Sequence, residues 1–188
     1  MLLVGGAGRN SGKTRLSCAV IRHFSRRFPL VGLKVTAIQD RDGPCPRGNE
    51  DGCGVCTSLE QDYLITEEDG SPEGKDTSLM LEAGAERVFW LRVLREHLLQ
   101  GVEALLQHVG RDALCVCESN SLRQVVEPGV FVIARARGAA SIKPSARAVL
   151  HLADRVVLSH AQGLDMAADD FDIKDRGWIL KEGKADET

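Results

Sequence analysis

Apolar residues recur along this chain in two ways, as short uninterrupted runs and as longer stretches with helical spacing. Leu2-Leu3-Val4 is a run of the first kind, and the stretch 13–28 carries Leu16, Val20 and Phe24 at intervals of four. An uninterrupted short run indicates a buried strand, whereas an interval of four places side chains along one stripe of a helix. The pattern therefore predicts a strand followed directly by an amphipathic helix.

The same two patterns predict the elements of the remaining chain. Strands are expected at 31–36, 87–93, 113–118, 130–134 and 155–159, helices at 76–83, 95–109 and 145–152, and a last strand at 178–180. Strands that alternate with helices are typical of an α/β fold with a mostly parallel sheet. At 188 residues the chain is long enough to bury one sizeable core, so a single domain over 1–188 is expected.

Residues 40–75 interrupt this alternation. The stretch contains ten acidic and three basic residues, is rich in glycine and proline, and holds three of the six cysteines. Local structure is expected only around Tyr63-Leu64-Ile65. Because an unstructured connection of this length is unusual inside a compact domain, we interpret 40–75 as an acidic, cysteine-bearing insertion with a function of its own.

Composition narrows the class of protein. The formal net charge of −3 gives no electrostatic reason to expect nucleic acid or an anionic membrane as partner. No apolar run approaches the roughly 20 residues that a membrane helix needs, and the apolar start is too short for a secretory signal. We therefore expect a cytoplasmic location, where cysteines are reduced thiols or metal ligands rather than disulfides.

The glycine-rich turn after the first strand carries the strongest chemical signal. Its sequence Ala7-x-x-x-x-Gly12-Lys13-Thr14 matches a phosphate-binding loop with alanine at the first glycine position. Backbone N–H groups and the start of the following helix favour phosphate, while Lys13 reaches the β- and γ-phosphates and Thr14 offers a hydroxyl to Mg²⁺. A chance glycine-rich turn is the alternative, but the strand before it and the helix after it favour the functional reading. The residues expected to contact the nucleotide are Gly8, Arg9, Asn10, Ser11, Gly12, Lys13, Thr14 and Arg15.

Three further charged residues are candidates for the same site. Glu118 ends the apolar run 113–117, where an unpaired carboxylate is costly, and it is a candidate for Mg²⁺ binding with Thr14 and for catalysis with Lys13. Its alternative role is to end the strand. Lys34 lies near the carboxyl end of the second strand, where ligands gather in open α/β sheets. Lys34 and Asp40 are candidate contacts for a phosphate or an anionic substrate, or else solvated surface residues.

The cysteines fall into two groups. Cys45, Cys53 and Cys56 lie in the insertion, and the Cys-x-x-Cys spacing of the last two is typical of zinc or iron–sulfur ligation. The local sequence supplies no fourth cysteine or histidine, so the spacing does not decide which metal would bind. The alternative is a loop whose thiols bind no metal. Cys18 lies on the first helix and Cys115 and Cys117 alternate on an apolar strand, and all three are expected to be core residues.

Several segments together resemble the molybdopterin-guanine dinucleotide biosynthesis adaptor family (MobB). The run Asn10-Ser11-Gly12-Lys13-Thr14 is similar to the phosphate-binding loop of that family. Lys75-Asp76-Thr77 and Glu82-Ala83-Gly84-Ala85-Glu86 resemble its Asp-Thr/Ser…Glu-Ala-Gly-Ala segment, and the strand that ends in Glu118 resembles its Val-Glu-Gly element. The resemblance extends from the start of the chain to about residue 159.

The resemblance implies a P-loop NTPase with a three-layer sandwich and a mostly parallel sheet. It also implies GTP binding with weak hydrolysis in molybdenum cofactor biosynthesis, a nucleotidyl transferase as partner, and a homodimer as one possible assembly. No Asn-Lys-x-Asp motif for guanine occurs, so GTP and ATP both stay open. One alternative is an ATP-dependent synthetase or kinase resembling dethiobiotin synthetase, whose Gly-x-Lys strand end is similar to Gly32-Leu33-Lys34. The other is a nucleotide-switched metallochaperone adaptor that acts through its cysteines.

Overall fold

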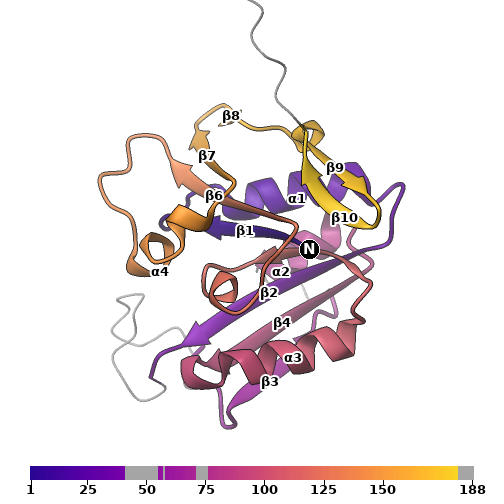
Figure 1. The fold of residues 1–188 in the computed structure, drawn as a ribbon, viewed down its shortest axis with the longest axis vertical. Coiled ribbons are helices and arrows are strands. Elements are labelled where there is room, and N and C mark those ends of the chain that lie inside the picture. The colour runs from indigo at the N-terminus through magenta and orange to yellow at the C-terminus, as the bar shows by residue number, and fades with distance from the viewer. Residues whose placement is uncertain (41–54, 57, 71–75, 182–188) are drawn as a thin grey trace, which may run out of the picture.

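The computed structural model describes residues 1–40, 55–56, 58–70 and 76–181, and its centre is an eight-stranded sheet (Figure 1). The strand order is β3-β4-β2-β5-β1-β6-β7-β8. The inner strands pair in parallel, and β3 and β8 add antiparallel edges. The predicted α/β class with a mostly parallel sheet is therefore confirmed. The strands are β1 Leu2–Gly6, β2 Leu30–Ile38, β3 Tyr63–Glu67, β4 Arg87–Leu94, β5 Leu114–Glu118, β6 Val130–Ala136, β7 Arg155–His160 and β8 Gly163–Leu164, with a separate hairpin of β9 Phe171–Lys174 and β10 Gly177–Leu180.

Helices and the separate hairpin cover both faces of the sheet. The helices α1 and α2 and the β9–β10 hairpin share one core cluster with the sheet, and α3 lies on the other face with the turns η2 and η3 (Figure 1). None of the helices in the described part of the chain combines the length and apolar character needed to cross a membrane. The helices are α1 Lys13–Phe24, α2 Asp76–Glu82, α3 Leu98–Val109 and α4 Pro144–Arg147, and the 3-10 turns are η1 Arg95–His97, η2 Ser121–Gln124, η3 Leu150–Leu152 and η4 Ala168–Asp170.

The two-sided cover explains why β1 has no polar side chain at any position. In β1, Leu2 and Val4 point to the α1 face and Leu3 points to the α3 face, and all three are fully buried. Because successive side chains of a strand alternate between faces, a strand covered on both sides has no solvent-facing position. The apolar run at the start of the chain is thus the sequence signature of a central parallel strand.

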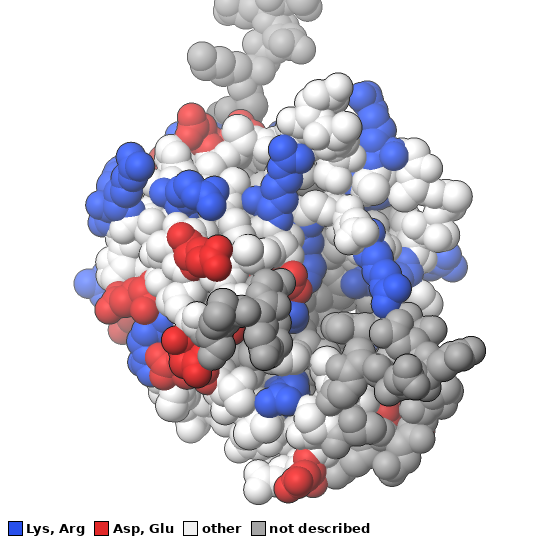
Figure 2. All heavy atoms as spheres, turned by 180° about the vertical axis from the view of Figure 1, so that it is seen from behind, with Lys and Arg blue, Asp and Glu red and all other residues white. Residues whose placement is uncertain are grey.

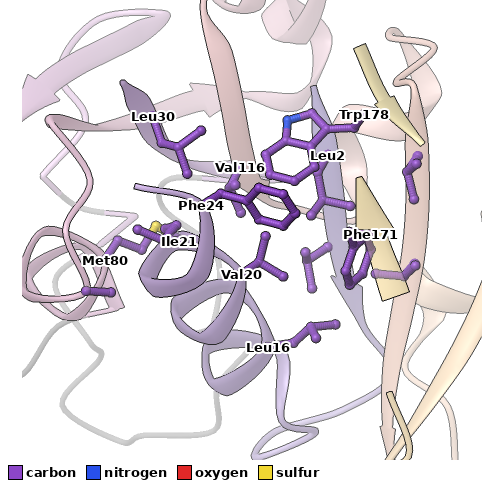
Figure 3. Packing of buried hydrophobic residues seen from close by; sticks show 14 of the residues in the cluster. Leu2, Leu16, Val20, Ile21, Phe24, Leu30, Met80, Val116, Phe171 and Trp178 are labelled. Carbon is purple, nitrogen blue, oxygen red and sulfur yellow. The ribbon is translucent and has the colours of Figure 1, made fainter. Parts of the chain in front are cut away.

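Helix α1 packs its predicted stripe against the sheet and the hairpin (Figure 3). Leu16, Val20 and Phe24 are all buried, as the spacing of four predicts. The Phe24 ring meets the Trp178 ring edge-on, with 5.0 Å between ring centroids. A residue near the end of the described chain therefore helps to hold the first helix in place.

All four predicted helices have different boundaries in the structure: the helix expected over 76–83 ends at residue 82, and the one expected over 95–109 begins as the turn η1 before α3. Helix α1 ends at Phe24 rather than at residue 28, because Pro29 disfavours helical backbone at the residue before it and the last residues form turns. The helix expected over 145–152 is wrong beyond α4, since Val149 leaves the helical region with φ −123° and becomes buried. The short strands β8 and β9 were not predicted, because two to four residues give too little periodicity to detect.

Phe24 provides a test of the packing between the first helix and the hairpin. We expect Phe24→Ala to lower the free energy of unfolding by about 3–5 kcal/mol, since it removes a buried ring and leaves a cavity beside Trp178. Leu99→Ala is the matched control, because Leu99 is 54% exposed on α3. Urea denaturation followed by circular dichroism measures both, and an equal loss in the two variants would contradict the packing described here.

Candidate nucleotide-binding site

The carboxyl ends of three neighbouring strands bring the predicted site residues together. In the sheet Val4 of β1 lies level with Glu118 of β5, and Glu118 lies level with Lys34 of β2. Partners in a parallel sheet point to the same face, here the face covered by α1 and α2. The register therefore places Lys34 and Glu118 side by side, next to the loop that leaves β1.

The loop between β1 and α1 presents free backbone donors at the start of the helix. Within the described ranges, no backbone hydrogen bond engages the N–H groups of residues 10–14. Gly12, just before α1, has φ +88°, and a Cβ on it would lie 2.7 Å from the Ser159 Cβ. Glycine is therefore required both by the backbone angle and by the close approach of β7. The first turn of α1 contains no acidic residue, so its positive dipole end is not neutralised from within the helix.

Asn120 fixes the other end of this loop and was not predicted as a site residue. Its Oδ1 accepts a hydrogen bond from the Gly6 N–H at 2.8 Å, and its Nδ2 donates to the Gly6 carbonyl at 3.1 Å. Nδ2 also lies 3.2 Å from the Ser145 hydroxyl. The side chain is buried, so these contacts are shielded from water and hold the end of β1 at a fixed position.

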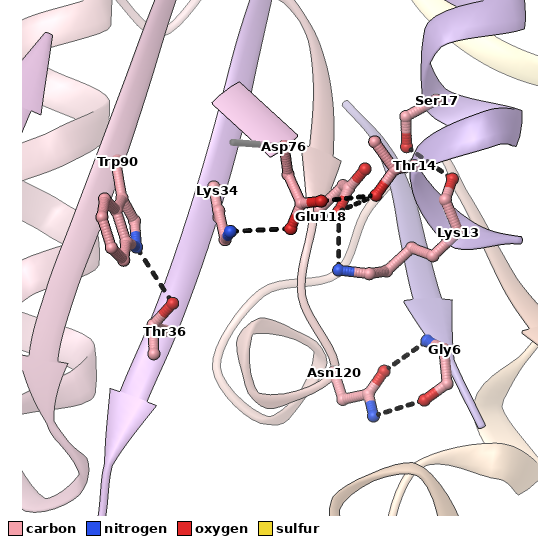
Figure 4. Close-up of polar contacts among 10 residues, drawn as sticks. All are labelled: Gly6, Lys13, Thr14, Ser17, Lys34, Thr36, Asp76, Trp90, Glu118 and Asn120. Atoms are coloured by element: carbon pink, nitrogen blue, oxygen red, sulfur yellow. Dashed lines mark hydrogen bonds and ion pairs between the residues drawn. The ribbon is translucent and has the colours of Figure 1, made fainter. Parts of the chain in front are cut away.

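Lys13 and Glu118 form the centre of the site (Figure 4). Lys13 Nζ lies 2.6 Å from Glu118 Oε2, and the Glu118 side chain has no exposed surface. The second carboxylate oxygen, Oε1, is buried without a hydrogen-bond partner. A buried carboxylate is stable only when it is paired, so Lys13 stabilises one oxygen and the other has unused capacity for a cation or a donor.

Thr14 connects this ion pair to a second one. The Thr14 hydroxyl lies 3.0 Å from Asp76 Oδ1 and 3.3 Å from Glu118 Oε2, and Lys34 Nζ lies 2.7 Å from Asp76 Oδ2 (Figure 4). Partial burial raises the pKa of Asp76, but the hydrogen bond and charge of Lys34, with contributions from Lys13 and Thr14, outweigh it and hold the pKa below 3.8. Asp76 is thus an ionised member of the site.

Asp76 was not predicted as a site residue, although it lies in a segment that carries the family resemblance. The available signal was an acidic residue at the first position of a short helix. Its contact with Thr14 spans 62 residues and therefore could not be read from local spacing.

The other predicted residues are distributed around this centre. Ser11 is buried with an unpartnered hydroxyl, and Gly8 lies in open space where an added Cβ would meet no atom within 4 Å. Asn10 is exposed and has a positive φ of +50°, which marks a tight turn, and Arg9 is also exposed. Arg15 donates to the Gln162 carbonyl at 3.4 Å. The exposed Asp40 follows the end of β2 by two residues.

The metal site expected at the cysteines stays a prediction. Cys45 and Cys53 lie outside the described residues, and Cys56 is partly buried against Ile38, Leu59 and Leu94. Across residues 1–40, 55–56, 58–70 and 76–181, no three His, Cys, Asp or Glu side chains are grouped so that they could hold a metal ion.

The cysteines assigned to the core are buried or packed against it. Cys115 and Cys117 lie in the core on the α3 face, and burial raises the pKa of Cys115 to about 11 and that of Cys117 well above its usual value. Cys18 on α1 packs against the other core, and burial, followed by the charge of Glu118, raises its pKa to about 11. All three thiols stay protonated near neutral pH, which disfavours reaction or metal binding.

A pocket separate from the candidate site lies at the opposite ends of the strands. Figure 2 shows the face of the molecule opposite to that of Figure 1, and both basic and acidic side chains border a hollow near its centre. This separate pocket measures about 680 Å³ and includes Val31 and Leu114, which lie near the starts of β2 and β5. It contains none of the predicted site residues, so the candidate site is defined by the side chains that converge at the carboxyl edge.

Comparison with known proteins does not assign this chain to a family. No family model matches the sequence, and no curated protein or solved structure matches it either. The chemistry of the site therefore rests on the residues themselves. They combine free N–H donors, two lysines, a threonine hydroxyl and two carboxylates, a set suited to a polyanion and a hard cation.

The ion pair between Lys34 and Asp76 predicts a dependence of stability on pH. Because the folded pKa of Asp76 is below the ordinary value of 3.8, its ionised form stabilises the fold above that value, and this contribution is lost as pH falls through the folded pKa. We expect Asp76→Asn to destabilise the protein at pH 7 and the difference from the parent to shrink below pH 3.8. Urea denaturation at pH 7, 5 and 3 measures this difference. In a Lys34→Met background the pH-dependent part should largely disappear, and its persistence would contradict the pairing.

Proposed function

We propose that this chain is a P-loop NTPase with a three-layer sandwich, which binds a nucleoside triphosphate with Mg²⁺ at the carboxyl edge of β1 and β5. One observation carries the proposal: Lys13 and Thr14, from the loop after β1, converge on the buried Glu118 at the end of β5. A chance glycine-rich turn would not require a buried carboxylate opposite its lysine and threonine. The free N–H groups of residues 10–14 add the expected contacts to phosphate.

The described residues fit Mg²⁺, which prefers oxygen ligands and is held in such sites by few carboxylates together with phosphates. Thr14 and Glu118 would hold it, and Asp76 adds a carboxylate within hydrogen-bond distance of Thr14. The unpartnered Glu118 Oε1 supports this assignment, because a buried oxygen without a donor needs a partner. When bound, Mg²⁺ would supply charge neutralisation on the β- and γ-phosphates.

The chain's own groups would act mainly through position and charge. Lys13 would leave Glu118 for the β- and γ-phosphates, while the N–H groups of the loop and the start of α1 stabilise charge on the phosphate oxygens. Water would be the nucleophile for hydrolysis. With the MobB resemblance we propose GTP as the nucleotide, molybdenum cofactor biosynthesis as the process, and a nucleotidyl transferase as the partner that accelerates a weak intrinsic activity.

Lys34 favours a second candidate function. Its ammonium group is 2.7 Å from Asp76 and level with Glu118, so it lies within the site rather than on the outer surface. A cation at this position suits an ATP-dependent synthetase or kinase resembling dethiobiotin synthetase, in which it would position an anionic substrate. Preference for ATP and a phosphorylated or ligated product would favour this alternative.

Calorimetric titration with GTP and with ATP, each with Mg²⁺, tests the proposal first. Tighter binding of GTP supports the adaptor function, and tighter binding of ATP supports the synthetase or kinase. The absence of binding to both would contradict the proposed class of protein.

Lys13→Ala should weaken triphosphate binding by about 10- to 100-fold, because a charge-assisted contact to phosphate is lost. The same variant leaves Glu118 buried without its cation and should also lose stability. The double variant Lys13→Ala/Glu118→Gln separates these effects, since it should regain stability but not affinity. Lys174→Ala is the control, as Lys174 is exposed on β9. Calorimetry at a temperature where every variant is folded measures the affinity, and parent-like binding by the double variant would refute the role of Lys13.

Glu118→Gln tests the proposed metal contact. We expect it to reduce the gain in nucleotide affinity that Mg²⁺ confers by about tenfold or more, because a buried charged ligand is replaced by a neutral amide. Affinity without Mg²⁺ should be retained, since Lys13 no longer needs to leave a carboxylate. Titrations with Mg²⁺ and with EDTA give the ratio, and an unchanged ratio would exclude Glu118 as a metal contact.

A further inference from the structure

We propose that Lys34, Trp90 and Arg92 form a subsite for an oxyanion, the carboxylate or phosphate group of a second small-molecule substrate, next to the triphosphate site. This inference rests on the proposed function and deepens it, because it assigns a substrate class to the part of the site around Lys34. Arg92 and Trp90 lie on β4 and belong to none of the sequence motifs described above.

The sheet register puts these residues on one surface. Lys34 is level with Trp90, and Thr36, the next residue of β2 on the same face, is level with Arg92. The Trp90 indole N–H donates to the Thr36 hydroxyl at 3.0 Å, which fixes the orientation of the ring (Figure 4). Thr36 and Arg92 lie one step nearer the carboxyl edge than Lys34, in the direction in which ligands bind to open α/β sheets.

Two cations flank the Trp90 ring. Lys34 Nζ is 5.1 Å from the ring centroid, and the Arg92 guanidinium carbon is 4.8 Å from it. Lys34 is paired with Asp76, whereas the contacts of Arg92 within the described residues are the ring and the Ser58 hydroxyl, to which Nη1 donates at 2.7 Å. No carboxylate in that part of the chain forms an ion pair with Arg92, so no described residue neutralises the guanidinium charge.

The guanidinium also has an unused donor. Arg92 Nε is buried without a hydrogen-bond partner, an arrangement that costs free energy unless a ligand or another group satisfies it. A planar guanidinium binds carboxylate and phosphate through parallel hydrogen bonds, which a lysine cannot reproduce. The pair of Lys34 and Arg92 therefore fits an oxyanion better than a neutral or cationic ligand.

The position relative to the nucleotide indicates a substrate rather than the nucleotide itself. Lys34 is level with Glu118, which contacts Lys13 and Thr14. Arg92 lies on the next strand, β4, and is level with Thr36, two residues beyond Lys34. The subsite is thus adjacent to the phosphates but lies on the side of the loop toward β4. An oxyanion bound there would be placed near the terminal phosphate.

Trp90 supplies the readout for a direct test. The fluorescence difference between the parent and Trp90→Phe isolates its emission, because Trp178 is buried in the core and is present in both proteins. The probes are succinate and inorganic phosphate, each added to protein with Mg²⁺ and a non-hydrolysable triphosphate, and in a parallel series without nucleotide. Sodium chloride at the same ionic strength is the control, and calorimetry with the same two anions repeats the measurement without a fluorophore.

We expect a saturable change in Trp90 emission with succinate or with phosphate, and the more tightly bound probe distinguishes a carboxylate from a phosphate substrate. Arg92→Met should weaken this anion binding at least about tenfold and leave triphosphate affinity within about twofold of the parent. Arg111→Met, at an exposed position before β5, should change neither.

Three results would overturn the subsite: no response of the parent to either anion, an equal response to chloride, or unchanged anion affinity in Arg92→Met. The absence of triphosphate binding by the parent is a separate result. It would contradict the proposed function, while the nucleotide-free series would still decide whether Arg92 binds an oxyanion.

Discussion

The buried carboxylate of Glu118 is the constraint on which the site depends. A charge at the end of a strand covered on both faces requires a cation, and Lys13 supplies it at 2.6 Å. This requirement fixes where the loop after β1 must lie and which way the first turn of α1 faces. The same carboxylate reaches Thr14 and, through it, Asp76 and Lys34. A row of alternating positive and negative side chains therefore connects the carboxyl ends of three neighbouring strands, β2, β5 and β1.

Contacts distant in sequence hold the loop between β1 and α1 in shape. Asn120 fixes Gly6 from the segment after β5, and Ser159 of β7 packs against Gly12. The loop can therefore keep its shape with few contacts within itself, because residues of the neighbouring strands fix its two ends. Such a loop can present free N–H groups before any ligand arrives, which lowers the cost of ordering it on binding.

Sequence patterns predicted the parts of this protein that depend on local order. The apolar run of β1, the stripe of α1 and the carboxylate that ends β5 could all be recognised, because a buried strand, an amphipathic helix and a costly charge each leave a mark within a few residues. Asp76, Asn120 and Arg92 could not be assigned in this way. Their contacts join residues 34 to 114 positions apart, and only the strand order brings these residues together. The prediction of a helix over 145–152 was wrong because a tertiary contact, the burial of Val149, overrides the local preference for helix.

The contact between Trp178 and Phe24 has a consequence for the order of folding. The first helix can complete its core only when the β9–β10 hairpin, more than 140 residues later, has been synthesised. Pairings this distant in sequence close slowly, because chain entropy must be lost before the contact forms. During synthesis the apolar stripe of α1 would stay partly uncovered, and the loop that precedes it would lack its final support. The chain would therefore complete the candidate site late, as one of the last features to form.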